Sequence, residues 1–202
     1  MRDQRCLAAC VSIPIFNVCL PVSRRLRSRL VGMHLLDYNP DDLDVTISEL
    51  LVATSDSADP DLPDVVPTVL RMLRTRLGMD VAFVSQIANG RRVIEAVDCA
   101  PGFSPVHAGQ SDPVEESWCQ YVVDGRLPEK IADAKPLIAQ GQAPDPGFPI
   151  GTHLSTPVRL PGGEIYGTLC CFSRTVNADA DIQRLRYTAN LIAEKLSPGT
   201  NG

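Results

Sequence analysis

The residues of this sequence with the most versatile chemistry are its seven cysteines and three histidines. There is no C-x-x-C pair, the cysteine count is odd, and Cys170 and Cys171 are adjacent on a predicted strand, where neighbouring side chains point to opposite faces. A disulfide framework is therefore not indicated, and we interpret the cysteines as reduced thiols of a cytoplasmic protein. The histidines, His34, His107 and His153, are too far apart in the sequence to suggest a structural zinc site.

Cys119 lies in a segment that the sequence predicts to be a short helix beginning at Asp112. Its thiol could react with or attach a ligand, or it could pack as a small apolar group. About two turns separate it from the predicted helix start, too far for the positive end of the helix to lower its pKa much, so packing is the preferred interpretation. Cys170 and Phe172 share one face of a later strand, and packing in the core is the simpler explanation for both.

Three polar residues are further candidates for contacting a ligand. His153 begins a predicted strand and could ligate a haem or hydrogen-bond a ligand, although a histidine at a strand end more often has only a structural hydrogen bond. Arg159 could pair with an anionic group or be a solvated residue at the end of its strand. Asp133 could accept a hydrogen bond from a ligand or cap a turn.

Sequence patterns of known catalytic sites are missing. The chain has no G-x-S-x-G or H-E-x-x-H motif and no convincing Cys-His pair. Gly162, Gly163 and Gly167 resemble a phosphate loop only superficially, because a strand follows them and not a helix. We therefore predict no catalytic residues and no metal site.

The stretch that must position these residues is Gly151 to Ser173, which predicts two strands joined at Pro161-Gly162-Gly163. Residues Leu154, Val158 and Leu160 of the first strand alternate with polar residues, so we expect them to face the first and last helices. The second strand is apolar on both faces, with Tyr166 on the same face as Cys170 and Phe172. Such a strand lies inside a sheet that is covered on both sides.

Other elements are predicted on both sides of this hairpin. A helix containing Leu70 and Leu73 precedes two strands joined at Asn89-Gly90, a strong hairpin signal. The remaining predicted elements are a helix from Asp112 with Val114, Trp118, Tyr121 and Val122 buried, a strand within Lys130–Ala134, a flexible cover loop over Lys135–Phe148, and a last helix with Ile182, Leu185, Ala189, Ile192 and Leu196 on its apolar face, capped by Asn177 or Asp179.

The N-terminal part of the sequence has a different character. An apolar run over residues 6–22, interrupted by prolines, is followed by a basic block, which leaves a secretory signal or a membrane anchor as alternatives. We favour a leader over residues 1–40 that is disordered or reflects a start assigned too early, with Met33 the true start. Residues 41–61 are expected to form a short helix and a linker, residues 62–197 one domain, and residues 198–202 a tail.

The order helix, hairpin, loop, short helix, loop, hairpin, helix resembles the GAF domain family of small-molecule sensors. The stretches LGMDVAFVSQIANGRR, DPVEESWCQYVVDGRLPEKIADA and IYGTLCCFS carry the resemblance, which extends from about Leu62 to Leu196 and is similar to GAF domains that precede cyclic-dinucleotide phosphodiesterase or kinase modules. It implies an α+β fold: a central antiparallel sheet of five or six strands, with helices on one face and a loop-roofed ligand cavity on the other.

The resemblance also implies a function, a regulatory sensor that binds an unidentified small molecule. The candidate ligand-binding residues are Cys119, Asp133, His153, Arg159, Cys170 and Phe172. No cofactor is indicated over the others that the family uses. Because the sequence stops at Gly202 without an output domain, we expect signalling through protein association, as a homodimer formed by the outer helices or with a separate output protein. The net charge of −5 disfavours nucleic acid as a partner, and a membrane is not expected either.

Two other functions remain as alternatives. One is a thiol-dependent oxidoreductase like the free methionine sulfoxide reductases, which would use Cys119 with Cys99 or Cys170, although the motif of those enzymes is not matched. The other is a dimerisation module whose cavity is filled by side chains.

Overall fold

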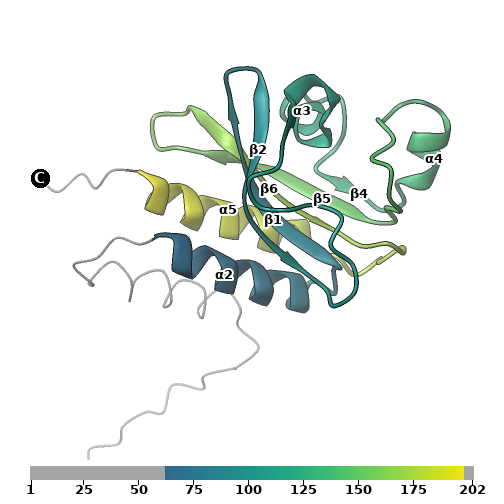
Figure 1. Ribbon diagram of the computed structural model, residues 1–202, viewed down its shortest axis with the longest axis horizontal. Coiled ribbons are helices and arrows are strands. Elements are labelled where there is room, and N and C mark those ends of the chain that lie inside the picture. Colours follow the sequence, from purple (N-terminus) through teal and green to yellow (C-terminus); the bar gives the residue numbers. More distant parts are fainter. Residues whose placement is uncertain (1–61, 198–202) are drawn as a thin grey trace, which may run out of the picture. The chain divides into compact units, whose positions relative to one another are not determined.

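The computed structural model describes residues 62–197, and in this range six strands form one antiparallel sheet. Its strand order is β3-β2-β1-β6-β5-β4, so β1 (Val81–Ala88) and β6 (Ile165–Phe172) lie at the centre (Figure 1). This α+β architecture confirms the predicted fold class. The predictions for residues 1–40, 41–61 and 198–202 concern parts of the chain outside the described range.

Helices and loops cover the two faces of the sheet differently. In Figure 1, α2 and α5 lie along one face, and α3 and α4 lie on the opposite side. The remaining elements are β2 (Arg91–Cys99), β3 (Ser111–Pro113), β4 (Lys130–Ile131), β5 (His153–Arg159), α2 (Leu62–Arg76), α3 (Trp118–Val123), α4 (Lys135–Ala139), α5 (Ile182–Leu196) and a 3-10 turn, Val114–Glu116. None of the helices within residues 62–197 is long and apolar enough to cross a membrane.

The larger core cluster lies between the sheet and the helices α2 and α5. Leu154 and Val158 of β5 are fully buried in it, as predicted, together with leucines of both helices. Leu160 does not belong to it, because β5 ends at Arg159 and Leu160 already lies in the turn. At about 1.5–3 kcal/mol for each large apolar side chain, this burial is a main source of stability.

The start of α5 differs in detail from the prediction. Asp181 caps α5, its Oδ1 accepting a hydrogen bond from the backbone of Gln183 at 2.8 Å. The prediction of Asn177 or Asp179 as the cap is therefore wrong. The side chain of Asn177 instead donates to the carbonyl of Leu77 at 2.8 Å, just after α2.

The β1–β2 hairpin forms as the sequence predicts. Asn89 and Gly90 adopt φ angles of 52° and 72°. Two consecutive positive φ angles are what the tight type I′ turn requires, and Asn-Gly accommodates them at low cost.

Two irregularities in the sheet change which side chains face the cavity. Along β6, Val158 pairs with Gly167 and Arg159 with Ile165, so Tyr166 is an extra residue. Tyr166 consequently packs against the helix-side cluster, and the prediction that it shares a face with Cys170 is wrong. On β2, Glu95 is extra in the same way, and Ile94 therefore lies on the cavity side while Ala96 packs against the helix side.

The segment around Asp112 is a strand and not the start of a helix. Ser111–Pro113 pairs with β2, where Asp112 is opposite Arg92. The helix α3 begins at Trp118, and the hydroxyl oxygen of Ser117 caps it by accepting from the backbone of Gln120 at 3.2 Å. Farther along, β4 is shorter than predicted, and the predicted cover loop contains the helix α4.

Candidate functional site

A cavity of about 210 Å³ lies on the face of the sheet opposite α2 and α5. Its apolar lining comes from Phe83, Val106, Trp118, Pro144, Pro146, Phe148, Ile150 and Phe172, and its polar lining from Arg92, Gln110, Asp112, Glu116, Ser117, Cys119 and His153. The lining thus combines five strands with α3 and with the loops that precede β3 and β5. This arrangement confirms the predicted cavity roofed by loops and short helices.

Aromatic rings hold the roof of the cavity against the sheet. Phe148, from the loop before β5, stacks on Phe172 with a centroid separation of 5.4 Å and an interplanar angle of 21°. The indole nitrogen of Trp118 donates to the carbonyl oxygen of Pro144 at 2.8 Å, which ties α3 to the same loop. The cavity is therefore closed by contacts between segments and not by one rigid element.

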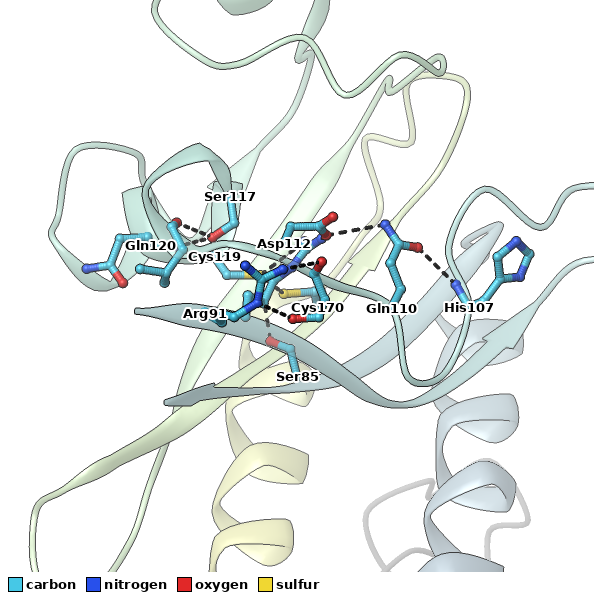
Figure 2. A network of polar contacts seen from close by, with 12 residues as sticks. Ser85, Arg91, His107, Gln110, Asp112, Ser117, Cys119, Gln120 and Cys170 are labelled. Carbon is cyan, nitrogen blue, oxygen red and sulfur yellow. Dashed lines mark hydrogen bonds and ion pairs between the residues drawn. The ribbon is translucent and has the colours of Figure 1, made fainter. Parts of the chain in front are cut away.

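Arg92 provides the positive charge in the cavity wall. Its guanidinium forms an ion pair with Asp112. Gln110 Nε2 donates to the same Asp112 Oδ2 at 3.2 Å (Figure 2). Arg92 Nη1 also lies 4.0 Å from Cys119 Sγ. The Arg92 side chain is only 12% exposed, and its buried Nε has no hydrogen-bond partner within the described residues.

His153 is the second buried polar group without a complete set of partners. The residue is 3% exposed, its ring meets that of Trp118 edge-on at 5.0 Å, and its Nδ1 has no hydrogen-bond partner among residues 62–197. Burial lowers the pKa of His153 to about 4, because the charged imidazolium loses its hydration. The ring is therefore neutral at physiological pH.

Two buried thiols lie side by side at the wall of the cavity. Cys119 Sγ and Cys170 Sγ are 3.6 Å apart, and both residues are fully buried (Figure 2). Cys170 Sγ also contacts the hydroxyl oxygens of Ser155 and Thr168, at 3.1 and 3.3 Å, and the hydroxyl of Ser85 donates to Cys119 Sγ at 3.8 Å. The four cysteines in the described part of the chain are all free.

The two thiols differ in acidity. A hydrogen bond from Cys170 and the positive charge of Arg92 lower the pKa of Cys119, and together they outweigh the effect of its burial. Burial and the neighbouring Cys119 raise the pKa of Cys170 well above its usual range. At neutral pH, Cys119 is thus the member of the pair with thiolate character.

The structure brings four of the six candidate residues together. Cys119, His153 and Phe172 line the cavity, and Cys170 contacts Cys119. Asp133 and Arg159 lie elsewhere: the exposed Asp133 accepts a hydrogen bond from the backbone of Lys135 at 3.1 Å, where α4 begins, and the exposed Arg159 lines a separate hollow with Glu129 and Arg186.

The sequence argument for an unreactive Cys119 had an incorrect premise. Because α3 begins at Trp118, Cys119 lies in the first turn of the helix and not about two turns in. Arg92 was missed as a cavity residue. Arg92 shares the cavity face with Ile94 by the ordinary alternation of a strand. The extra residue Glu95 hides this face in the sequence, because it puts Val97 and not Ala96 on the same side as Ile94. No cluster of three or more potential metal ligands occurs within residues 62–197.

Known proteins share this fold. A GAF domain family model matches residues 59–197. Among solved structures, the GAF domain of Acinetobacter phosphoenolpyruvate-protein phosphotransferase has a TM-score of 0.56 and 16% identity, covering 78% of this chain and 96% of that one. A putative GAF sensor protein from Burkholderia vietnamiensis has a TM-score of 0.58 and 14% identity, covering 76% and 92%.

A third structure contains a bound pigment. The phycoerythrobilin-bound GAF domain from a cyanobacterial phytochrome has a TM-score of 0.54 and 13% identity, covering 75% of this chain and 95% of that one. At these identities the structural matches show a common fold and not a common ligand. The search of curated protein sequences returned no match.

Proposed function

Since this chain belongs to the GAF domain family, we propose that it is a regulatory sensor whose cavity binds a small organic molecule. The observation that carries the proposal is the pair of buried nitrogen atoms, His153 Nδ1 and Arg92 Nε, that lack partners although both side chains line the cavity. A buried polar atom without a hydrogen bond costs about 1–3 kcal/mol, and a ligand atom at the right place would remove that cost.

The lining indicates the kind of molecule that would fit. Phe148 and Phe172 offer a stacked aromatic surface, which favours a flat or apolar body. Arg92 favours an oxygen acceptor, because a guanidinium only donates hydrogen bonds, and the neutral ring of His153 supplies one further polar contact. We therefore propose a ligand with a small apolar body and at least one carbonyl, carboxylate or hydroxyl oxygen.

The volume of the cavity sets an upper size. About 210 Å³ is below the roughly 300–1,000 Å³ that is usual for pockets holding drug-sized ligands. A four-ring bilin or a haem is at least drug-sized, so neither is proposed here. A metabolite of one or two rings suits the space better.

Native mass spectrometry of the gently purified full chain tests this proposal. We expect a non-covalent adduct of low mass that disappears in His153→Phe, which keeps the aromatic contact with Trp118 but removes the ring nitrogens. Arg159→Gln is the matched control, because Arg159 is exposed and lies outside the cavity lining, and this variant should keep the adduct.

Two results would contradict the proposal. One is a wild-type protein that carries no adduct and whose Trp118 fluorescence does not respond to a library of small carboxylates and aromatic acids. The other is an adduct of the same occupancy in His153→Phe, which would place the binding site elsewhere. Turnover of free methionine sulfoxide with dithiothreitol would instead favour the oxidoreductase alternative.

The output of such a sensor is proposed to pass through protein association, as a homodimer or with a separate protein. Tyr187 of α5 is 40% exposed and Val176, before α5, is 53% exposed, and these are the large apolar residues most exposed within residues 62–197. Sedimentation velocity of the wild type and of Tyr187→Glu measures this: we expect a dimer that the charge weakens at least about tenfold. A wild type that stays monomeric at high micromolar concentration would exclude the homodimer.

A further inference from the structure

We propose that Cys119 and Cys170 form an oxidant-reactive thiol pair that closes into a reversible disulfide when a hydroperoxide enters the cavity. This reaction goes beyond ligand sensing, because it requires no bound ligand and changes the protein covalently. It would make the cavity wall a site of modification as well as a site of binding.

The geometry of the pair is close to what a disulfide requires. The sulfur atoms are 3.6 Å apart, and a disulfide bond of about 2.05 Å would need them to approach by roughly 1.5 Å. Cys170 is fixed within the central strand β6, whereas Cys119 lies on α3, a helix of six residues. We expect α3 to supply the movement, because this short helix is tied through Trp118 to a loop, at the carbonyl of Pro144, and not to the central sheet.

The position of the pair gives the two thiols different roles. Cys119 belongs to the cavity lining although it is fully buried, so it is the thiol of the pair that lies nearer to a small peroxide in the cavity. Cys170 is not part of the lining, and its sulfur is held within the sheet by contacts with the hydroxyl groups of Ser155 and Thr168. Cys119 is therefore the attacking thiol and Cys170 the resolving thiol.

Electrostatics support the same assignment. The pKa of Cys119 is lowered by the hydrogen bond from Cys170 and by Arg92, which favours the nucleophilic thiolate. The raised pKa of Cys170 keeps that residue a thiol, so it can supply a proton when it reacts. Arg92 remains next to the sulfur because its own position is fixed by the ion pair with Asp112.

The reaction balances with the hydroperoxide as the only oxidant. The Cys119 thiolate attacks the terminal peroxide oxygen, the O–O bond breaks, and the alkoxide leaves and takes a proton from water, giving Cys119 sulfenic acid and an alcohol. Cys170 Sγ then attacks Cys119 Sγ, the S–O bond breaks, and the hydroxide leaves as water with the proton of Cys170. Two thiols lose two electrons, one hydroperoxide gains them, and an external dithiol reverses the change.

Two other cysteines are internal controls. Cys171 faces the helix-side cluster, and burial raises its pKa. Cys99 is half-buried, and its pKa is also raised by burial. Neither has a sulfur partner like that of Cys119, so we expect both to react more slowly than Cys119 with the same peroxide.

The test exposes the reduced full-length chain to tert-butyl hydroperoxide, quenches it with N-ethylmaleimide at timed intervals, and maps the peptides by mass spectrometry. We expect a linked Cys119–Cys170 peptide as the first product, which dithiothreitol removes. In Cys170→Ser, dimedone should trap Cys119 as sulfenic acid. Arg92→Gln should slow the reaction about twofold at pH 7 and about fivefold at pH 6, as a rise of one unit from a pKa of about 6 would, while Arg159→Gln should not change it.

The wild-type experiment alone can overturn the proposal, whether or not the variants fold. It fails if Cys99 or Cys171 is oxidised before Cys119, or if the linked peptide forms as fast in urea as in the native protein. Absence of the linked peptide at a peroxide concentration that oxidises Cys99 also overturns it. These outcomes do not depend on a small-molecule ligand, so they are independent of the test of sensing by native mass spectrometry.

Discussion

Gly167 of β6 lies so close to the main chain of Ser85 on β1 that a Cβ atom at Gly167 would meet the Ser85 carbonyl oxygen at 1.8 Å. Only glycine fits at this point of the central strand pair. The contact also fixes Ser85, whose hydroxyl is 2.9 Å from that of Thr168 and reaches Cys119. The glycine that superficially resembles part of a phosphate loop is thus required by the sheet.

Gly167→Ala should destabilise the protein by about 1–3 kcal/mol or more, because the new methyl group must push apart two central strands. Gly162→Ala is the matched control: a Cβ atom there meets no atom within 4 Å, and the change should stay within about 0.5 kcal/mol. Urea unfolding followed by circular dichroism measures both. Equal midpoints for the two variants would show that β1 and β6 can separate without cost.

The stability of the protein should fall in mildly acidic solution because of His153. In the unfolded chain this histidine takes up a proton near its ordinary pKa of 6.5, and in the folded protein only near pH 4. Above pH 6.5 the free energy of unfolding is therefore not reduced by this histidine, and as the pH falls from 6.5 to 4 it decreases by about 3 kcal/mol. Urea unfolding between pH 4 and 8 measures the effect.

The matching variants isolate that contribution. His153→Phe should flatten the pH dependence in this window, because no proton can be taken up at the position. His107→Gln, at an exposed loop histidine, should leave the dependence as it is in the wild type. If His153→Phe shows the same acid loss as the wild type, other groups cause it.

Cys119 should be alkylated by iodoacetamide at neutral pH, and faster than Cys171. Arg92 Nη1 lies 4.0 Å from its sulfur, and Arg92 is itself paired with Asp112. Its alkylation rate should level off at a pH below the ordinary thiol value of about 8.5, and Arg92→Gln should move the midpoint upward. Timed quenching and peptide mapping give the rates. A buried thiol that stays unmodified for hours would support the packing interpretation instead.

Trp118→Phe should loosen the roof of the cavity. The substitution keeps an aromatic ring but removes the bond from the indole to the carbonyl of Pro144, at a cost of about 0.5–1.5 kcal/mol. Hydrogen exchange should become faster in residues 143–150, while the strand β6 should keep its protection. Unchanged exchange in that loop would mean that Phe148 and its stacking partner hold the roof without help.

Local signals in the sequence were sufficient for much of the fold. Asn89-Gly90 predicts the first hairpin, and the apolar periodicity of residues 182–196 predicts α5, because both depend on neighbours in the chain. The two extra residues, Glu95 and Tyr166, could not be found in this way, since a bulge is a shift in the pairing between two strands and leaves no local mark in either of them. They put Val97, and not Ala96, on the cavity side with Ile94, and they put Tyr166 on the helix side.

The site itself was partly accessible from sequence. His153 and Cys119 could be selected by residue type, but the partnership of Cys119 with Arg92 depends on the strand β3. The local pattern Asp-Pro-Val-Glu favours a helix start, and the pairing of Asp112 with Arg92 across β2 and β3 overrides it. Such an override is a property of the tertiary structure.

The order of the strands has a consequence for synthesis on the ribosome. The hairpin of β1 and β2 is made early, yet the second neighbour of β1 is β6, and α5, which covers the same face as α2, is made last. Until β6 is translated, the nascent chain carries an open strand edge, with Val81 and Phe83 still lacking their contacts with Phe172. Translation that stalls before Ile165 therefore leaves a chain whose open β1 edge can pair with the strands of other nascent chains on the polysome.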